Sequence, residues 1–330
     1  MSDVVALASE LLGIESTTGR ERDAVDFVSR WLVSRGWNVS LQEVEPGRSN
    51  VWATRKGGGV TLSTHLDTVP PFIPPRLDGN RLYGRGACDA KGIAAAMMIA
   101  AQRLADQGEE RVDLLFVVGE EKGSPGARAA NRLPATSRYL VNGEPTESKL
   151  ASGCKGAQRV IVRVRGREAH SAYAHLGSSA LEPLLELLPQ LKHLALPTDD
   201  VLGETTYNIG VLRAGTEANI VPGLAEAELM IRLVGDVAPV KAAFAAWAGT
   251  KAELVWGSHI PAQRFDVLSG FEVEPVAYTS DIPLLDKWGA PLLFGPGSIH
   301  VAHTPLEYID VAELEASVDA YARIVRTLLA

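Results

Sequence analysis

The chain has 330 residues, of which 46% are hydrophobic and 22% are charged, a composition that is ordinary for a globular protein of two domains. The formal net charge is −8 and the basic residues are dispersed, which argues against a nucleic-acid or membrane partner. The N-terminus lacks the basic start of a signal peptide, the longest apolar run is too short to cross a bilayer, and two cysteines, Cys88 and Cys154, give no disulfide framework. We therefore expect a cytoplasmic location.

The first half of the chain alternates predicted strands with predicted helices. Apolar residues at helical spacing predict helices at 4–12 and 21–34, and the apolar run at 93–101 predicts a buried helix. The Pro-rich segment 69–75 cannot join the interior of a sheet and is predicted to be a surface loop. Strands are predicted at 37–44, 50–54, 60–64, 111–118 and 139–142.

From Cys154 onward the pattern changes to that of a small α+β layer with its own sheet. The order is strand, helix, strand, strand, helix, strand, and we assign it to an inserted domain at 153–257, which leaves 1–152 and 258–330 as the other domain. The chain then returns through a short helix at 280–287 that is opened by Ser280 as its N-cap. The remaining predicted elements are strands at 157–165, 207–212, 225–233 and 291–297 and helices at 178–191, 237–248 and 311–329.

Acidic and histidine side chains gather in short loops rich in Gly or Pro beside the apolar segments of the first domain. Three strands end in such residues, as expected for a ligand site at the carboxyl edge of an open α/β sheet. Taken singly, each of these side chains has an ordinary structural explanation, but their joint placement indicates one site. The residues are His65, Asp67, Asp89, Glu120, Glu121, Glu144 and His303.

Two histidines and several carboxylates suit two borderline cations such as Zn²⁺ or Mn²⁺. A bridging carboxylate can hold two metals ~3.5–4 Å apart, which lowers the pKa of a shared water and polarises a carbonyl. Glu120 and Glu121 are neighbours on a backbone expected to be extended, so only one can easily ligate and the other is free to act as general base. The chain has neither the Gly-Lys-Ser/Thr of a P-loop nor a Gly-x-Ser-x-Gly elbow, which disfavours phosphate binding and a serine hydrolase.

Five motifs occur in order: His65-Leu-Asp-Thr-Val-Pro70, Tyr83-Gly-Arg-Gly-Ala-Cys-Asp-Ala-Lys-Gly92, Gly119-Glu-Glu121, Gly143-Glu-Pro145 and Ala302-His303. Together they resemble the acetylornithine deacetylase and succinyl-diaminopimelate desuccinylase family of di-zinc hydrolases, whose relatives include aminoacylases and glutamate carboxypeptidases. The similarity runs from the first predicted helix to the last. It implies an α/β catalytic domain with a mixed central sheet flanked by helices, and an inserted α+β lid through which the protein forms a homodimer.

The resemblance also implies roles for individual residues. His65 and Glu144 would hold one zinc ion, Glu121 and His303 the other, and Asp89 would bridge the two, with Co²⁺ or Mn²⁺ as substitutes. Asp67 would orient His65, Glu120 would be the base that activates water, and the peptide bond between Asp89 and Ala90 would be cis. The lid would supply His170 across the dimer to the oxyanion of the reaction. The substrate would be bound by Lys155, Tyr173, Asn219, Arg232, Ser280 and Gly297.

Two local features refine the expected substrate. The stretch Ser152-Gly-Cys-Lys-Gly156 is similar to the Lys-Gly of acetylornithine and acetyl-lysine deacetylases, which favours a short neutral acyl group. Met230-Ile-Arg232 stands where a lid strand of the family often carries Asp-x-Arg, so Arg232 remains available for a substrate carboxylate but lacks its usual neighbour. We therefore expect a deacetylase of an N-acyl amino acid in arginine or lysine biosynthesis. The alternatives are a desuccinylase, a dipeptidase or carboxypeptidase, and a non-catalytic binding protein of the same fold.

Overall fold

The computed structural model describes residues 2–330, which divide into two compact units. Of the described residues, the first unit consists of 2–152, Phe265–Glu274 and Ser280–Ala330, and the second of Gly153–Arg264 and Pro275–Thr279. The sequence placed the end of the inserted domain at residue 257, which lies inside strand β14 (Glu253–Ile260). Among the described residues, no helix has both the length and the apolar character needed to span a membrane.

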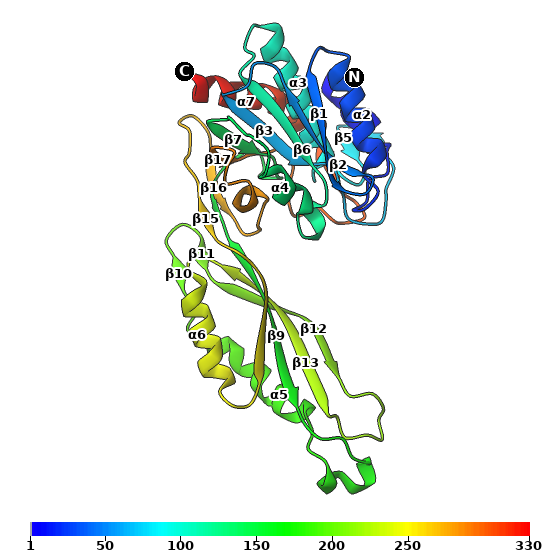
Figure 1. The fold of residues 1–330 in the computed structure, drawn as a ribbon, viewed down its shortest axis with the longest axis vertical. Coiled ribbons are helices and arrows are strands. Elements are labelled where there is room, and N and C mark those ends of the chain that lie inside the picture. The colour runs from blue at the N-terminus through cyan, green and yellow to red at the C-terminus, as the bar shows by residue number, and fades with distance from the viewer. Residues whose placement is uncertain (1) are drawn as a thin grey trace. The chain divides into compact units, whose positions relative to one another are not determined.

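The first unit is built on a mixed sheet. Its described residues contribute six strands, in the order β1-β2-β6-β3-β7-β17. Strands β6, β3, β7 and β17 are mutually parallel, whereas β1 and β2 are antiparallel to their neighbours (Figure 1). The parallel strands therefore end at the same edge of the sheet. The strands are β1 (Asn38–Glu45), β2 (Arg48–Thr54), β3 (Val60–His65), β6 (Val112–Val117), β7 (Tyr139–Asn142) and β17 (Ala290–Leu293).

Both faces of this sheet are covered, which explains the continuous apolar runs of its central strands. On β6, Val112, Leu114 and Phe116 belong to the core that the sheet shares with four helices, while Leu115 and Val117 are buried on the opposite side. Helix α4 (Pro125–Ala130) contacts β1, β2 and β6 (Figure 1). The four helices are α1 (Asp3–Leu12), α2 (Arg22–Val33), α3 (Lys91–Asp106) and α7 (Val311–Leu329).

Helix α3 is the central helix of this unit because it contacts α1, α7, β3 and β6. Its Ala- and Gly-rich sequence keeps its side chains small, so neighbouring elements approach it closely. A small antiparallel sheet, to which residues 2–330 contribute three strands, combines two distant parts of the sequence. Two of its strands precede α3 and lead into the loop before that helix, and the third follows β17. Its strands are β4 (Arg76–Asp78), β5 (Arg81–Tyr83) and β18 (Tyr308–Asp310).

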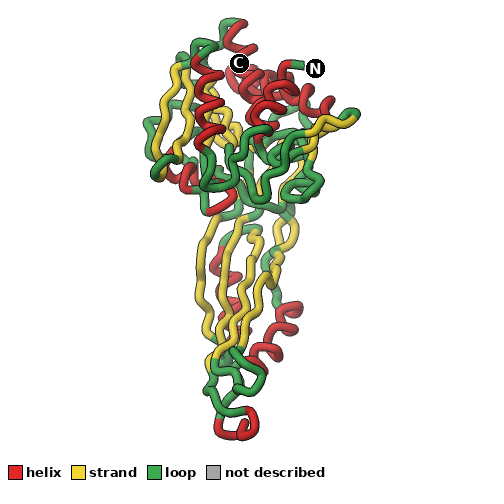
Figure 2. Tube along the Cα trace, turned by 90° about the vertical axis from the view of Figure 1, so that its right-hand side faces the viewer, coloured by secondary structure: helices red, strands yellow, loops and turns green. Residues whose placement is uncertain are grey.

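The second unit contains the predicted strand and helix order. Its main sheet, made by four strands of the described chain, has the antiparallel order β12-β13-β9-β14. Figure 2 draws the long strands of this unit in yellow. Helices α5 and α6 bury Leu184, Val240 and Phe244 in a core shared with this sheet. The elements are β9 (Gly156–Arg165), α5 (Leu181–Leu187), β12 (Thr206–Ala214), β13 (Leu224–Leu233) and α6 (Val237–Ala248), with the small strands β10 (Thr198–Asp199) and β11 (Gly203–Glu204).

Two predicted helices are shorter than the sequence indicated. The segment 178–191 is the α-helix α5 followed by a 3₁₀ helix, η3 (Leu188–His193), and the change coincides with Pro189, which cannot donate a helical hydrogen bond. The predicted helix at 280–287 is a single 3₁₀ turn, η4 (Ile282–Leu284), that contains Pro283. The strands β8 (Leu150–Cys154), β15 (Gln263–Arg264) and β16 (Val273–Val276) form a further small sheet. The 3₁₀ helix η2 covers Ser171–Leu176.

Candidate metal centre

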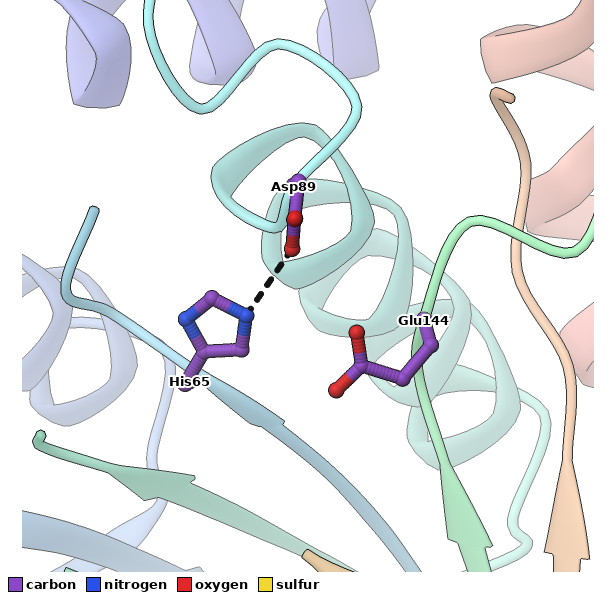
Figure 3. Close-up of side chains that lie close together, drawn as sticks. All are labelled: His65, Asp89 and Glu144. Atoms are coloured by element: carbon purple, nitrogen blue, oxygen red, sulfur yellow. Dashed lines mark hydrogen bonds and ion pairs between the residues drawn. The ribbon is translucent and has the colours of Figure 1, made fainter. Parts of the chain in front are cut away.

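The ends of parallel strands bring the predicted site residues of the first unit together. His65 is the last residue of β3, and Glu144 follows β7, its neighbour in the sheet. Asp89 approaches the same edge from the loop that precedes α3, and its peptide bond to Ala90 is cis, as expected. Figure 3 shows the His65 ring, the Asp89 carboxylate and the Glu144 carboxylate directed toward a common space.

These three side chains form the first of two groups of candidate metal ligands. His65 Nε2 lies 3.0 Å from Asp89 Oδ1, and one ligand atom from each of His65, Asp89 and Glu144 lies within 4.8 Å of the others. All three residues are buried. Glu144 Oε1 is itself buried and finds no hydrogen-bond partner within residues 2–330. An unpartnered buried carboxylate oxygen beside an imidazole and a second carboxylate is a donor set that a divalent cation fits.

The second group contains Asp89, Glu121 and His303. His303 Nε2 lies 3.2 Å from Asp89 Oδ2 and 2.9 Å from Glu121 Oε1. Asp89 therefore contributes one oxygen to each group. A carboxylate that faces two histidines with its two oxygens has the arrangement of a bridging ligand between two metals.

The charges of this cluster are strongly perturbed. Burial raises the pKa of Glu144 well above its ordinary value. Hydrogen bonds that the Asp89 and Glu121 carboxylates accept from His303 raise the pKa of this histidine to about 10, because both carboxylates favour its charged form. Burial opposes the charged form of His65, but its hydrogen bonds with Asp67 and Asp89 raise its pKa well above the ordinary range. The cluster thus holds an excess of buried carboxylates, and bound cations would compensate their charge.

Glu120 and Glu121 lie in a turn, which corrects the expectation of an extended backbone. They begin the 3₁₀ helix η1 (Glu120–Lys122), which is bounded by Gly119 and Gly123 with φ of 78° and 85°. Both glycines occupy the left-handed region that other residues rarely adopt. The turn directs Glu121 to His303. Burial and the negative charge of Asp281 raise the pKa of the Glu120 carboxyl well above its ordinary value.

Asp67 contacts both the turn that contains Glu120 and Glu121 and the ring of His65. Its carboxylate accepts hydrogen bonds from the main-chain N–H of Glu120 at 3.0 Å and of Glu121 at 3.3 Å, and from Thr18 Oγ1 at 2.8 Å. His65 Nδ1 lies 2.9 Å from the carbonyl oxygen of Asp67 and 3.6 Å from its carboxylate. The side chain of Asp67 is thus bonded to the Glu120–Glu121 backbone, and its own main chain contacts the His65 ring.

Asp281 is a buried acid near the centre that sequence reasoning missed. It precedes η4 and lies directly after Ser280, which was selected as a substrate residue. Burial raises the pKa of Asp281 to about 6, and the hydroxyl of Ser124 opposes that shift. The sequence signal for a buried acid was its position directly before the apolar segment Ile282–Leu285. Burying a carboxylate costs free energy, so a buried acid is a candidate for a functional role.

The predicted substrate residues fall in both units. In the first, Ser280 is buried and its hydroxyl accepts from Ile282 N, while Gly297 donates its N–H to Glu313 Oε1 at 2.9 Å. In the second unit they form two sets at opposite ends of β9. Lys155 directly precedes β9, and Arg232 pairs with Ala157 at its start.

The other set follows the end of β9. The rings of His170 and Tyr173 have centroids 6.4 Å apart, and the carbonyl of Asn219 accepts from Ser171 N at 2.9 Å. His170 Nδ1 accepts a hydrogen bond from Ala172 N at 3.2 Å. In the set at the start of β9, Lys155 donates a hydrogen bond from its Nζ to the carbonyl oxygen of Glu204 at 2.6 Å.

Comparison with known proteins identifies relatives across the whole chain. Residues 61–327 match the family described as Peptidase family M20/M25/M40. A Peptidase M20 domain-containing protein of Schizosaccharomyces pombe is 38% identical over 98% of this chain and 84% of its own length. A probable carboxypeptidase of Aspergillus clavatus is 37% identical over 99% of this chain and 83% of its own length.

Solved structures share the fold at low sequence identity. A tripeptidase from Staphylococcus aureus superposes with a TM-score of 0.83 at 20% identity, covering 99% of this chain and 98% of that one. An M20 family metallo-carboxypeptidase from Sulfolobus solfataricus superposes with a TM-score of 0.78 at 18% identity, covering 98% and 99% of the two chains.

Proposed function

Because the chain belongs to peptidase family M20/M25/M40 and is thus a hydrolase of amide or peptide bonds, we propose that it is a two-metal exopeptidase that releases the C-terminal residue of small peptides. The observation that supports two metals is the position of Asp89, which belongs to both groups of candidate ligands. The description of the 37%-identical Aspergillus relative supports the carboxypeptidase activity.

In this proposal five residues hold the cations: His65 and Glu144 one, Glu121 and His303 the other, and Asp89 both. Zn²⁺ fits this set of imidazole and carboxylate donors. When bound, the cations would lower the pKa of a shared water and polarise the scissile carbonyl.

Glu120 is the proposed general base. Its raised pKa lets its carboxylate take a proton from the attacking water and return it to the leaving amine. The hydrogen bond from its main-chain N–H to Asp67 fixes the turn from which it acts. Glu121, the next residue in the same turn, is bonded to His303 and so is occupied as a ligand.

The second unit would complete the site as a dimer. Lys155 and Arg232 lie at the start of β9 and His170 beyond its end, and a strand of its 10 residues spans roughly 33 Å. A small substrate cannot contact both sets in one subunit. The exposed apolar residues Ile209 and Leu212 on the edge strand β12 support pairing with a second copy. His170 of one subunit would then donate to the oxyanion formed in the other.

Deacetylation of N-acetylornithine or N-acetyl-lysine, which the sequence favoured, is the second candidate. It is supported by the likeness of Ser152–Gly156 to the Lys-Gly segment of such deacetylases. The two activities place different groups on the acyl side of the scissile bond but share a free carboxylate on the amine side.

The test is a substrate panel assayed with zinc-loaded protein. The panel contains N-blocked dipeptides, free dipeptides, N-acetyl amino acids and N-succinyl amino acids. A carboxypeptidase cleaves the N-blocked dipeptides with the highest kcat/KM. A preference for N-acetyl amino acids over all peptides would establish the second candidate instead, and a preference for free dipeptides would establish a dipeptidase.

A further inference from the structure

A buried ion pair lies behind the metal centre, in the loop that carries Asp89. The loop 84–90 connects β5 to α3 and all its residues are buried. Its main-chain N–H groups must therefore find partners inside the protein. Glu307, on the segment between His303 and β18, supplies them with one carboxylate.

Glu307 is only 1% exposed, and its Oε1 accepts hydrogen bonds from three main-chain N–H groups of the loop. The distances are 2.9 Å from Gly86 N, 3.3 Å from Cys88 N and 3.2 Å from Asp89 N. The last of these groups belongs to the residue that is shared by both ligand groups. One carboxylate oxygen thus fixes the backbone from which Asp89 projects.

Arg85 extends the same contact to the second histidine. Its Nη1 donates to Glu307 Oε2 at 2.6 Å, and its guanidinium also donates to the carbonyls of Thr304 at 3.2 Å and His303 at 3.4 Å. His303 has φ of 63°, a conformation that a histidine keeps only where its surroundings impose it. The ion pair therefore holds the main chain of two ligands, Asp89 and His303.

The start of α3 is fitted to the same loop. A Cβ at Gly92 would lie 2.2 Å from the carbonyl oxygen of Ala87, so the loop folds directly over the helix. Gly92 N donates to Gly86 O at 3.1 Å, which closes the loop on itself. The backbone of this loop therefore has little room to rearrange if the Glu307 carboxylate is lost.

We propose that Glu307, with Arg85, is a positioning residue for the metal pair: it sets the backbone of Asp89 and His303 and thereby the affinity for cations. The inference rests on the proposed two-metal function. The hydrogen bonds of the ion pair reach the main chain of Asp89, which both ligand groups share, and of His303, which belongs to only one of them. Its loss should therefore weaken one cation more than the other.

The test is titration of the metal-free protein with Co²⁺, followed by calorimetry and by the visible absorption of bound cobalt. The wild type is expected to take up two ions. Glu307→Gln keeps the shape of the side chain but removes its charge. We expect the weaker of the two Co²⁺-binding steps of this variant to lose 10–100-fold in affinity, which is the typical effect of mutating a residue that supports a metal ligand. The cobalt spectrum of that step should change as well, because the ligand geometry changes. Asp89→Ala is the positive control, since it removes the shared ligand.

Leu32→Ala is the matched control for lost stability, because Leu32 is fully buried in α2, which packs on β1 and β2. It should lower the Tm of the metal-free protein and leave both cobalt affinities unchanged. If Glu307→Gln does not fold, Arg85→Lys provides the second variant: it keeps the charge beside Glu307 and loses the forked contacts to His303 and Thr304. The same split of the two binding steps is expected from it.

Three results would overturn the inference. Unchanged affinities and spectrum in a folded Glu307→Gln of lower Tm would make the ion pair merely structural. An equal loss of affinity in Leu32→Ala would assign the effect to general instability. Failure of the wild type to bind two ions would overturn the proposed two-metal function, and the inference with it, whereas in the first two results the wild type still binds both.

Discussion

Adjacent carboxylates have different surroundings at the metal centre. Glu121 is hydrogen-bonded to His303, whereas Glu120 is buried near Asp281 with a raised pKa. A residue that holds a cation and one that moves a proton respond differently to removal. The two roles can therefore be separated by measuring metal content and turnover on the same sample.

Glu120→Ala is expected to lose nearly all turnover while two metals stay bound, because the proposed base does not ligate. General-base catalysis contributes ~10²–10⁴-fold, so a loss of that order in kcat is expected. The measurement is kcat together with elemental analysis of the purified variant, with Glu121→Ala as the comparison that should lose a metal. Loss of one ion from Glu120→Ala would reassign Glu120 as a ligand.

Asp281→Asn tests the electrostatics of the same base. The negative charge of Asp281 adds to burial in raising the pKa of Glu120, so its removal lowers that pKa. The acidic limb of the pH profile of kcat/KM should move to lower pH, because Glu120 ionises earlier. Asp286→Asn removes an exposed carboxylate a few residues further on and serves as control. An acidic limb that stays in place would separate Asp281 from the proton transfer.

At the scale of the elements, the sequence predicted the parts of the site that follow strands. Continuous apolar runs that end in acids or histidine identified β3, β6 and β7, and their parallel pairing brings His65 and Glu144 together. The short strands β4, β5 and β18 were not predicted, because they are only three residues long and exist through their pairing with one another. The same limit applies to side chains: the partner of Arg85 is Glu307, 222 positions away, and no local pattern connects the two.

The turn η1 shows another limit of local patterns. A strand ending in Gly-Glu-Glu suggested divergent side chains on an extended backbone. The left-handed conformations of Gly119 and Gly123 instead bend the chain into a turn, and Asp67 fixes it through two main-chain hydrogen bonds. A glycine can adopt either conformation, so the choice between them came from a tertiary contact.

Strand β6 contains a carboxylate that serves no described contact of the metal centre. Asp113 is 2% exposed, its Oδ1 has no hydrogen-bond partner in the described chain, and burial raises its pKa to about 6. The unfolded chain releases this proton near pH 4, so the folded state binds more protons between about pH 4 and 6. Asp113 should therefore contribute a loss of stability as pH rises through that window.

Asp113→Asn should reduce that fall by the contribution of Asp113 and raise the free energy of unfolding at pH 7 by about 1–3 kcal/mol, since one pKa unit corresponds to about 1.4 kcal/mol. Denaturant unfolding of metal-free protein at several pH values measures both effects. Asp319→Asn, which removes an exposed carboxylate on α7, controls for the change in net charge. Equal pH dependence in Asp113→Asn and the wild type would contradict the assignment.

At the scale of the whole molecule, the dimer proposal predicts complementation between inactive variants. His170→Ala and Glu120→Ala dimers are mixed under conditions in which subunits exchange. If His170 acts across the dimer, a mixed dimer has one site with an intact Glu120 and an intact His170 from the other subunit, so activity rises above that of both parents. Removal of such an oxyanion donor typically costs ~10²–10³-fold, so the gain is measurable. Demonstrated exchange without a gain would place His170 at its own subunit's site or outside catalysis.

Because the second unit is inserted in the first, the chain of the second unit is synthesised before that of the first is complete. The first unit is discontinuous: β17, His303 and α7 are synthesised after Gly153–Arg264, yet β17 pairs with β7 and α7 packs on α3. The second unit can therefore fold on the nascent chain while the sheet of the first still lacks an edge and the metal centre still lacks a ligand. The group His65, Asp89 and Glu144 lies entirely before the second unit in sequence, whereas the group Asp89, Glu121 and His303 is complete only after His303 has been synthesised. We therefore expect the two cation sites to become available at different times during synthesis.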